Sequence, residues 1–401
     1  SIFEKTDMGD FIGVKGKIFK TKTGEVTVKV RELTLLTKSL HPLPEKWHGL
    51  QDTELRYRQR YVDLIVNQNV KEIFVLRSRV ISGIRKFLEE KGFLEVETPI
   101  LHVLQGGAAA KPFKTHHNAL NMPLFLRIAP ELYLKRLIVG GFEKVFELGR
   151  VFRNEGMSFK HNPEYTMLEV YQAYADYIDI MALTEDLISS TVKKELGTTE
   201  VTFKDMKIDF KKPWKRITLK DALMRFAGID IELGHDELVK LAKDRGVDNA
   251  GNMGHGKLIN ELYDRFVEQH LIQPTFIIDY PIETSPLAKK KRDNPKLVER
   301  FEVIVAGMEM ANAFSELNDP IDQKQRFEKQ TELKKAGDEE TESMDEDYVN
   351  ALEYGMPPTG GLGIGIDRLI MLMTNSHSIR EVLLFPHMRS AYAKATEDKP
   401  Q

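Results

Sequence analysis

Charged and phenolic side chains alternate with apolar ones along residues 151–174, VFRNEGMSFKHNPEYTMLEVYQAY. Successive side chains of a strand point to opposite faces, so an antiparallel hairpin gathers every second residue on one face. That face carries a guanidinium, two carboxylates and two phenols, supplied by Arg153, Glu155, Glu169, Tyr165 and Tyr171. The pattern predicts a site for an anion beside an amine or a base. A solvated sheet face with surface ion pairs is the alternative.

A second acidic set lies in RFEVIVAGMEMANAFSELND, residues 300–319. Glu302 sits in an apolar run, and Glu309 follows a turn predicted at Ala306-Gly307. An unpaired buried carboxylate is costly, and Mg²⁺ takes one or two carboxylates together with substrate phosphates. We therefore expect Glu302 and Glu309 to bind Mg²⁺, with pairing to lysines as the alternative.

The segment GGLGIGIDR, residues 360–368, places three glycines on one face of a predicted strand. A flat ligand or a small amine could lie against that face, although close strand–helix packing is another reason for glycine there. Arg368 follows at the start of a predicted helix, where its planar guanidinium suits a purine and phosphates. Together the three stretches indicate a nucleoside triphosphate site on an antiparallel sheet, with phosphates neutralised by arginines and metal ions.

The composition narrows the class of protein. The chain has 401 residues, a net charge of −3, 41% hydrophobic residues and no cysteine. The slightly negative net charge excludes a strongly basic protein that attracts nucleic acid through its overall charge. The lack of cysteine excludes disulfides and thiolate zinc sites. The sequence shows no apolar run of membrane-spanning length. We expect a protein of the reducing cytoplasm with no membrane partner.

The rest of the sequence predicts the domains and secondary-structure elements that position these residues. Alternating runs around Lys22-Thr23-Gly24 predict a β-hairpin over residues 10–37. We expect residues 1–40 to be part of a small β-barrel and 41–66 to be a linker. Residues 67–390 are expected to form an α+β domain, mainly an antiparallel sheet with flanking helices. A helical insertion is expected at about 217–270 and a tail at 391–401.

Three ordered motifs resemble those of class II aminoacyl-tRNA synthetases. GFLEVETP is similar to motif 1, FRNE with the loop and strand that follow to motif 2, and GLGIGIDR to motif 3. RIAPELYLKRL, FSELND and ALEYG resemble strings of the bacterial lysyl branch of this family. The resemblance covers nearly the whole chain. It implies the class II catalytic fold, preceded by part of an OB-fold that reads the anticodon, so that the chain is N-terminally truncated.

The resemblance also implies a site for ATP. It includes two arginines, Arg153 and Arg368, that are expected to be catalytic. Arg153 would hold the α-phosphate and the amino-acid carboxylate, and Glu155 would read the adenine amine. The adenine would lie between Tyr165 and Arg368. The other residues implied near ATP or its Mg²⁺ are His161, Asn162, Glu302 and Glu309.

For the amino acid, the resemblance implies a lysine pocket. The α-amino group would meet Gly107 and Glu131, although a first-turn glutamate is also favourable to the helix dipole. The remaining pocket residues are Glu169, Tyr171, Asn312, Phe314 and Glu316.

The resemblance implies the activity of a lysine–tRNA ligase, with ATP, L-lysine and tRNA(Lys) as substrates, Mg²⁺ as cofactor and a homodimer as the expected assembly. Two alternatives stay open: a lysyl-transferase paralogue that modifies a translation elongation factor, and a synthetase-like regulator without catalysis.

Overall fold

The computed structural model describes residues 3–44, 50–108, 110–335 and 344–389. The described residues divide into two compact units, one within the ranges 1–72 and 388–401 and one within residues 73–387. The tail expected at 391–401 lies outside the described residues. Within the described ranges, no helix is long and apolar enough to span a membrane.

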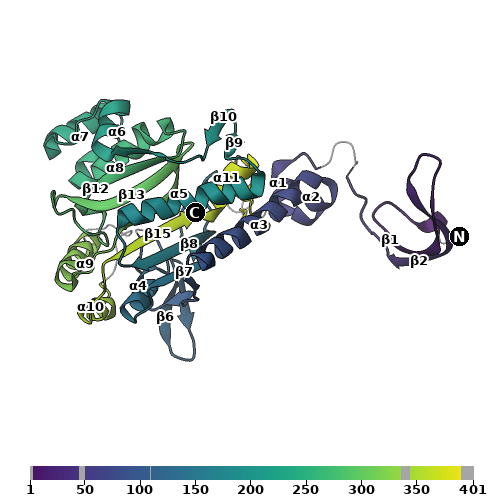
Figure 1. The fold of residues 1–401 in the computed structure, drawn as a ribbon, viewed down its shortest axis with the longest axis horizontal. Helices are drawn as coiled ribbons and strands as arrows, with labels where there is room; N and C mark the ends of the chain where they lie inside the picture. The colour runs from purple at the N-terminus through teal and green to yellow at the C-terminus, as the bar shows by residue number, and fades with distance from the viewer. Residues whose placement is uncertain (1–2, 45–49, 109, 336–343, 390–401) are drawn as a thin grey trace, which may run out of the picture. The chain divides into compact units, whose positions relative to one another are not determined.

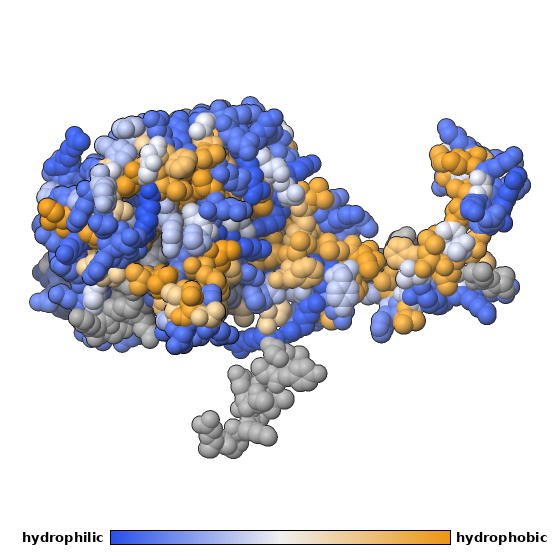
Figure 2. All heavy atoms as spheres, turned by 90° about the horizontal axis from the view of Figure 1, so that it is seen from below, coloured by the Kyte–Doolittle hydropathy of each residue, from blue (hydrophilic) through white to orange (hydrophobic). Residues whose placement is uncertain are grey.

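The first unit contains the predicted β-hairpin. Its strands β1 (Phe11–Lys20) and β2 (Val26–Thr37) pair antiparallel, and Gly24 adopts a positive φ of 87° in the turn between them. Apolar side chains of these strands are exposed, as the orange surface of the hairpin in Figure 2 shows; Phe11, Ile18 and Val26 are 68%, 75% and 70% exposed. Strands of this kind need further strands to bury such side chains. The hairpin is consistent with part of an OB-fold.

Two short helices lie within the segment expected as a linker, namely α1 (Thr53–Arg58) and α2 (Arg60–Val66). Asp52 caps α1 by accepting a hydrogen bond from the backbone N–H of Leu55 at 2.7 Å. The domain boundaries given above stay predictions.

The second unit is built on a sheet of eight strands within the described residues (Figure 1). All neighbours in this sheet pair antiparallel except the two pairs at its ends, β11–β12 and β3–β7, which are parallel. The predicted α+β class with a mainly antiparallel sheet is confirmed. In spatial order the strands are β11 (Lys215–Thr218), β12 (Thr275–Pro281), β13 (Leu297–Val305), β14 (Met308–Ser315), β15 (Thr359–Gly365), β8 (Glu164–Ala173), β7 (Lys144–Phe152) and β3 (Leu94–Glu95).

One face of this sheet is covered by helices and forms the main core. The helices are α3 (Gln68–Glu90), α5 (Tyr177–Leu196) and α11 (Ile366–Thr374). Apolar residues at helical spacing, such as Val80, Ile84 and Leu88 of α3, pack against Phe146 and Leu168 of the strands. Alternation along the strands therefore leaves the other face free for polar groups.

Among the described residues, helices pack on the other face at its two ends. Helices α4 (Glu131–Val139), α9 (Pro320–Lys335) and α10 (Glu346–Glu353) build an apolar cluster against β7 and β8. At the opposite end, α6 (Leu219–Ala227), α7 (His235–Asp244) and α8 (His255–Phe266) pack on β12 and β13. These three helices fall within the predicted helical insertion. The strip of sheet between the two clusters carries the polar residues.

Smaller sheets lie beside these layers. Strands β4 (Leu101–His102), β6 (Met122–Leu126) and β5 (Lys114–His117) form one, and β9 (Glu200–Phe203) and β10 (Met206–Asp209) form a hairpin.

The prediction that Arg153 and Glu155 lie on a strand is wrong. Strand β7 ends at Phe152. The backbone N–H of Arg153 still donates to the carbonyl oxygen of Pro163 at 2.8 Å. Proline has no N–H to return that hydrogen bond, so the ladder stops there. Arg153 and Glu155 therefore begin the loop that leaves β7.

A buried ion pair connects α3, β8 and α11. Arg77 Nη1 lies 2.5 Å from Asp367 Oδ1, and Asp367 Oδ2 accepts a hydrogen bond from the backbone N–H of Thr166 at 2.7 Å. Arg77 Nη2 also donates to Thr166 Oγ1 at 3.0 Å. This network holds the first turn of α11 against the sheet. Arg368 follows Asp367 in that turn and is therefore held in place as well.

Asp367→Ala should lower the free energy of unfolding by about 3 kcal/mol, because removing one partner of a buried pair leaves the other charge uncompensated. Denaturant unfolding followed by circular dichroism measures this change. Lys86→Ala, which breaks the exposed Lys86–Glu90 pair on α3, is the control and should change stability by less than about 0.5 kcal/mol. Equal effects of the two variants would contradict a supporting role for Asp367.

Candidate active site

Two rows of side chains cross the uncovered strip of the sheet, because residues opposite one another on paired strands point to the same side. The first row, in order across β13, β14, β15, β8 and β7, is formed by Glu302, Asn312, Gly363, Glu169 and Glu147. The second row, over the same strands, is formed by Arg300, Phe314, Gly361, Tyr171 and Val145. Strand pairing thus brings together most of the predicted pocket residues from three distant stretches of sequence.

Three glutamates, Glu131, Glu169 and Glu316, lie close enough to influence one another, and they are 7%, 2% and 1% exposed. The ammonium of Lys135 lies 2.5 Å from Glu131 Oε1 and 2.5 Å from Glu316 Oε2. Tyr171 Oη donates to Glu169 Oε2 at 3.0 Å. Among the described residues, none donates a hydrogen bond to Glu316 Oε1. A buried carboxylate oxygen without a donor points to a cationic ligand.

Burial and mutual repulsion shift the ionisation of this pocket. Burial, followed by the charge of Glu131, raises the pKa of Glu169 to about 8, although Tyr171 and Lys135 oppose the shift. Burial also raises the pKa of Glu131, which the nearby ammonium of Lys135 counteracts. At neutral pH the unliganded pocket therefore keeps a proton on Glu169.

Glycines make room for these side chains. A Cβ on Gly361 would lie 1.9 Å from Glu316 Oε1 and 2.7 Å from Tyr171 Cε1, so only glycine fits there. The glycine face of β15 thus holds pocket side chains close to the strand. Gly107, in a loop with a positive φ of 87°, lies against Glu131: a Cβ would come within 3.4 Å of Glu131 Cβ. The structure therefore places Gly107 and Glu131 side by side.

Asn312 and Phe314 of β14 complete the pocket. The carbonyl oxygen of the Asn312 side chain accepts a hydrogen bond from Arg300 Nε at 3.1 Å. The ring of Phe314 lies under the ammonium of Lys135, 5.5 Å from the ring centre. The two residues therefore contact the charged groups of the site from the same strand.

The loop after β7 holds the residues expected near ATP. The guanidinium of Arg153 lies 5.4 Å from the centre of the Tyr165 ring, and its Nε has no hydrogen-bond partner among the described residues. His161 Nδ1 is 2.8 Å from Ser158 Oγ, and Asn162 donates to the backbone oxygen of Glu164 at 2.7 Å. Burial and then Arg368 lower the pKa of His161 to about 4, so its ring is neutral at pH 7. Glu155 is exposed in the same loop.

A bulge brings Glu309 to the same face as Glu302. The register of β13 and β14 shifts between Val303 and Ile304, so that Met310 is skipped and Glu309 pairs with Ile304. An extra residue in one strand re-aims the next side chain. Burial raises the pKa of Glu302 to about 8, Arg300 counteracts this, and Glu309 adds to it.

The two carboxylates are paired with arginines rather than with lysines. Arg300 Nη2 lies 2.6 Å from Glu302 Oε1, and Arg368 Nη1 lies 3.5 Å from Glu309 Oε2. Within the described ranges, no group of three acidic or histidine side chains could enclose a metal ion. Two hard oxygen donors on one face fit a Mg²⁺ ion that takes its remaining ligands from phosphates and water.

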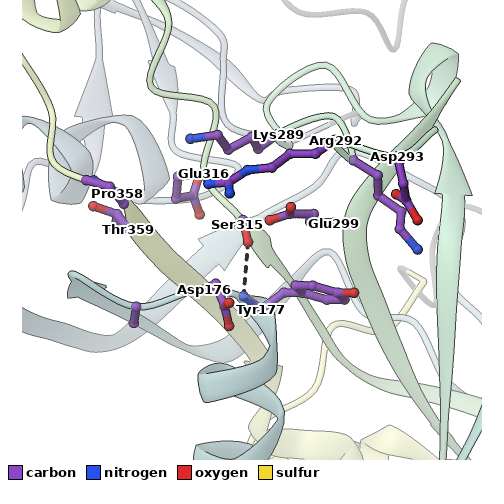
Figure 3. Close-up of a pocket in the computed structure, with 12 residues that line it drawn as sticks. Asp176, Tyr177, Lys289, Arg292, Asp293, Glu299, Ser315, Glu316, Pro358 and Thr359 are labelled. Atoms are coloured by element: carbon purple, nitrogen blue, oxygen red, sulfur yellow. Dashed lines mark hydrogen bonds between the residues drawn. The ribbon is translucent and has the colours of Figure 1, made fainter. Parts of the chain in front are cut away.

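A hollow of about 470 Å³ is lined in part by Ser315 and Glu316. Figure 3 shows Lys289 and Arg292 on one side of it and Asp176 on the other. Its charges are of both signs, so it indicates no class of ligand. Apart from Glu316, it contains none of the predicted site residues.

Comparison with known proteins agrees with this geometry. Residues 52–389 match the family model described as tRNA synthetases class II (D, K and N). The chain belongs to this class II tRNA synthetase family. Among curated relatives, the lysine–tRNA ligase of Carboxydothermus hydrogenoformans is 61% identical over 97% of this chain and 80% of its own length. Those of Pelotomaculum thermopropionicum and Bacillus subtilis are 60% and 56% identical, each over 97% of this chain and 78% of their own lengths.

Two charged residues of this synthetase site were missed by sequence reasoning. Lys135 follows Glu131 by four positions on a predicted helix, and that spacing places the two side chains on one face. Arg300 precedes Glu302 by two positions on a predicted strand, which also gives a shared face. Both could have been found by searching for the cations that the buried glutamates require.

In the unliganded protein, Glu169 should reduce stability as the pH rises. Its carboxyl has a raised pKa of about 8 when folded and an ordinary, lower pKa when unfolded. The folded state therefore binds more protons between these two values, and stability falls with pH in that window. In Glu169→Gln, the melting temperature relative to the unaltered protein should rise by about 2 °C or more from pH 5 to pH 8.

Thermal unfolding at several pH values measures this difference. The control is Glu353→Gln, an exposed glutamate at the end of α10, which should give the same pH dependence as the unaltered protein. A Glu169→Gln curve parallel to that of the unaltered protein would show that Glu169 is ionised in the empty pocket.

Proposed function

We propose that the protein is a lysine–tRNA ligase. It joins L-lysine to ATP to form lysyl-adenylate and pyrophosphate, and then transfers the lysyl group to the 3′-terminal hydroxyl of tRNA(Lys), releasing AMP. The observation that carries this proposal is the buried pocket of Glu131, Glu169 and Glu316 beside the arginine-bearing strip of sheet. The names of the relatives at 56–61% identity support it.

The pocket suits the two ammonium groups of lysine. Glu169, Tyr171 and Glu316 hold the ε-ammonium, and Glu316 Oε1 supplies a buried acceptor that has no other donor among the described residues. Glu131 and Gly107 hold the α-ammonium. Sites built for a buried polar group reject analogues that lack it by about 10⁴–10⁵-fold.

Activation requires placement and charge stabilisation. Arg153 binds the lysine carboxylate and the α-phosphate, so that one carboxylate oxygen attacks the α-phosphorus in line while the bond to pyrophosphate breaks. Adenine lies between Tyr165 and Arg368 and is read by Glu155, with His161 and Asn162 beside the phosphates. Mg²⁺ held by Glu302 and Glu309 would neutralise phosphate charge. The attacking carboxylate carries no proton, so the neutral ring of His161 is not needed as a base.

We also propose a homodimer that works in the cytoplasm. A lysyl-transferase acting on an elongation factor, or a regulator without catalysis, would need the same pocket for lysine but no tRNA. The matched relatives that are named as lysine–tRNA ligases favour the tRNA substrate.

Lysine should support ATP–pyrophosphate exchange by this protein, and the other standard amino acids should support it at least about 10³-fold less, because they lack a second ammonium group at that distance. Exchange of labelled pyrophosphate into ATP with each amino acid in turn measures this. Preferred exchange with aspartate or asparagine, or none with any amino acid, would overturn the proposed function.

Glu316→Gln should raise the KM for lysine roughly 10- to 100-fold with a smaller effect on kcat, since it removes a charged hydrogen bond of about 1.5–3 kcal/mol from bound lysine. The KM for ATP should not change. Glu299→Gln is the matched control, because Glu299 lines the neighbouring hollow outside the lysine pocket. An unchanged KM for lysine in Glu316→Gln would remove Glu316 from lysine recognition.

A further inference from the structure

Lys135 is a fully buried cation in the pocket that the proposed mechanism does not use. It lies on α4 one turn after Glu131, and its side chain is 0% exposed. Its ammonium contacts both Glu131 and Glu316, each at 2.5 Å. A charge at this depth is tolerated only when it is paired.

The surroundings hold this ammonium in one place. The Lys135 ammonium lies 5.5 Å from the centre of the Phe314 ring on β14 and 5.8 Å from the centre of the Tyr348 ring on α10. Burial alone would lower the pKa of Lys135, but Glu131 and Glu316 outweigh burial and raise it well above its ordinary value. The raised pKa favours the ammonium form of Lys135 at neutral pH.

The charges of the pocket can then be counted. Glu131, Glu169 and Glu316 supply three negative charges when all are ionised, and Lys135 cancels one of them. Arg127 pairs with the neighbouring Glu147, so that pair adds no net charge. The ionised pocket therefore has a net charge of −2 from these groups. This charge balances the two ammonium groups of a ligand whose carboxylate pairs with Arg153.

We propose that Lys135 is a permanent counter-ion of the amino-acid pocket, which sets its net charge to match a ligand with two ammonium groups. This inference rests on the proposed function, because it concerns how the same site recognises lysine. Lys135 acts as a positioning residue: its charge counteracts the rise in the pKa values of Glu131 and Glu316 that burial causes, its ammonium holds both carboxylates in place, and it touches no reacting atom.

A different role is conceivable for an ammonium in this position. Lys135 could imitate the ε-ammonium of lysine in the empty pocket and leave when the substrate binds. The two roles predict opposite results. Loss of a counter-ion weakens lysine binding, because one more glutamate keeps its proton, whereas loss of an imitator tightens it.

The test is the Lys135→Met variant, which has a similar shape without charge, assayed by lysine-dependent ATP–pyrophosphate exchange. At pH 7.5 its KM for lysine should be at least about 10-fold higher than that of the unaltered protein, with a smaller change in kcat. A lower KM for lysine, or an unchanged one, would overturn the proposal.

The pH profile separates charge from simple structural damage. Lysine binding needs the ionised form of Glu169, so kcat/KM for lysine should rise with pH toward a plateau, with an inflection near the pKa of Glu169 of about 8. Lys135 lowers that pKa, so the inflection should move upward by about one pH unit or more in Lys135→Met and stay in place in Lys135→Arg. The titratable and charged groups that face Glu169 are Tyr171 on its own strand, Glu147 on β7, Glu131 and Lys135 on α4, Glu316 after β14, and Arg153.

Two controls complete the experiment. Lys144→Met neutralises a lysine of β7 whose ammonium contacts the backbone oxygen of Lys91, and it should leave the KM and the inflection unchanged. If Lys135→Met does not fold, Lys135→Met/Glu316→Gln is compared with Glu316→Gln, since replacing both partners of a buried pair is better tolerated. An inflection at the same pH in these two proteins would also overturn the proposal. Failure of the unaltered protein to use lysine would instead refute the proposed function.

Discussion

Burial of three carboxylates in one pocket is the constraint on which the rest of this structure depends. Glu131, Glu169 and Glu316 are each less than 10% exposed, and three negative charges cannot be buried together without compensation. The protein supplies one cation from Lys135, and burial raises the pKa values of all three carboxyls, which favours their protonated forms in the empty pocket. Further positive charge is needed to compensate the ionised carboxylates, and the two ammonium groups of a diamino acid supply it. The charge of the empty pocket therefore matches that of its proposed ligand.

The architecture makes that burial possible. Paired strands carry the charged rows across one face, while the other face packs on α3, α5 and α11 and supplies the apolar core. Close approach of the pocket side chains to the strand requires Gly361, because any side chain there would collide with Glu316 and Tyr171. The Arg77–Asp367 pair fixes the start of α11 and thereby the position of Arg368. Stability from the core thus offsets a pocket that is unfavourable when empty.

Much of this could be predicted from sequence, since period-two alternation places Glu169 with Tyr171 and Asn312 with Phe314. Two features could not. The end of β7 before Arg153 depends on the proline that happens to lie opposite. The bulge that brings Glu309 beside Glu302 reverses the face expected from simple alternation. Lys135 has no distinctive signal in the sequence, because a lysine four residues after a glutamate is equally typical of an exposed helix face.

Proton release on lysine binding tests the central claim most directly, because a ligand ammonium must replace the proton on Glu169. Calorimetric titration of the protein with lysine at pH 7, without ATP, in buffers of different ionisation enthalpy gives the number of protons exchanged. With a pKa of about 8 in the unliganded protein, Glu169 alone should release about one proton per bound lysine. Lysine binding without proton release, or with proton uptake, would contradict the account.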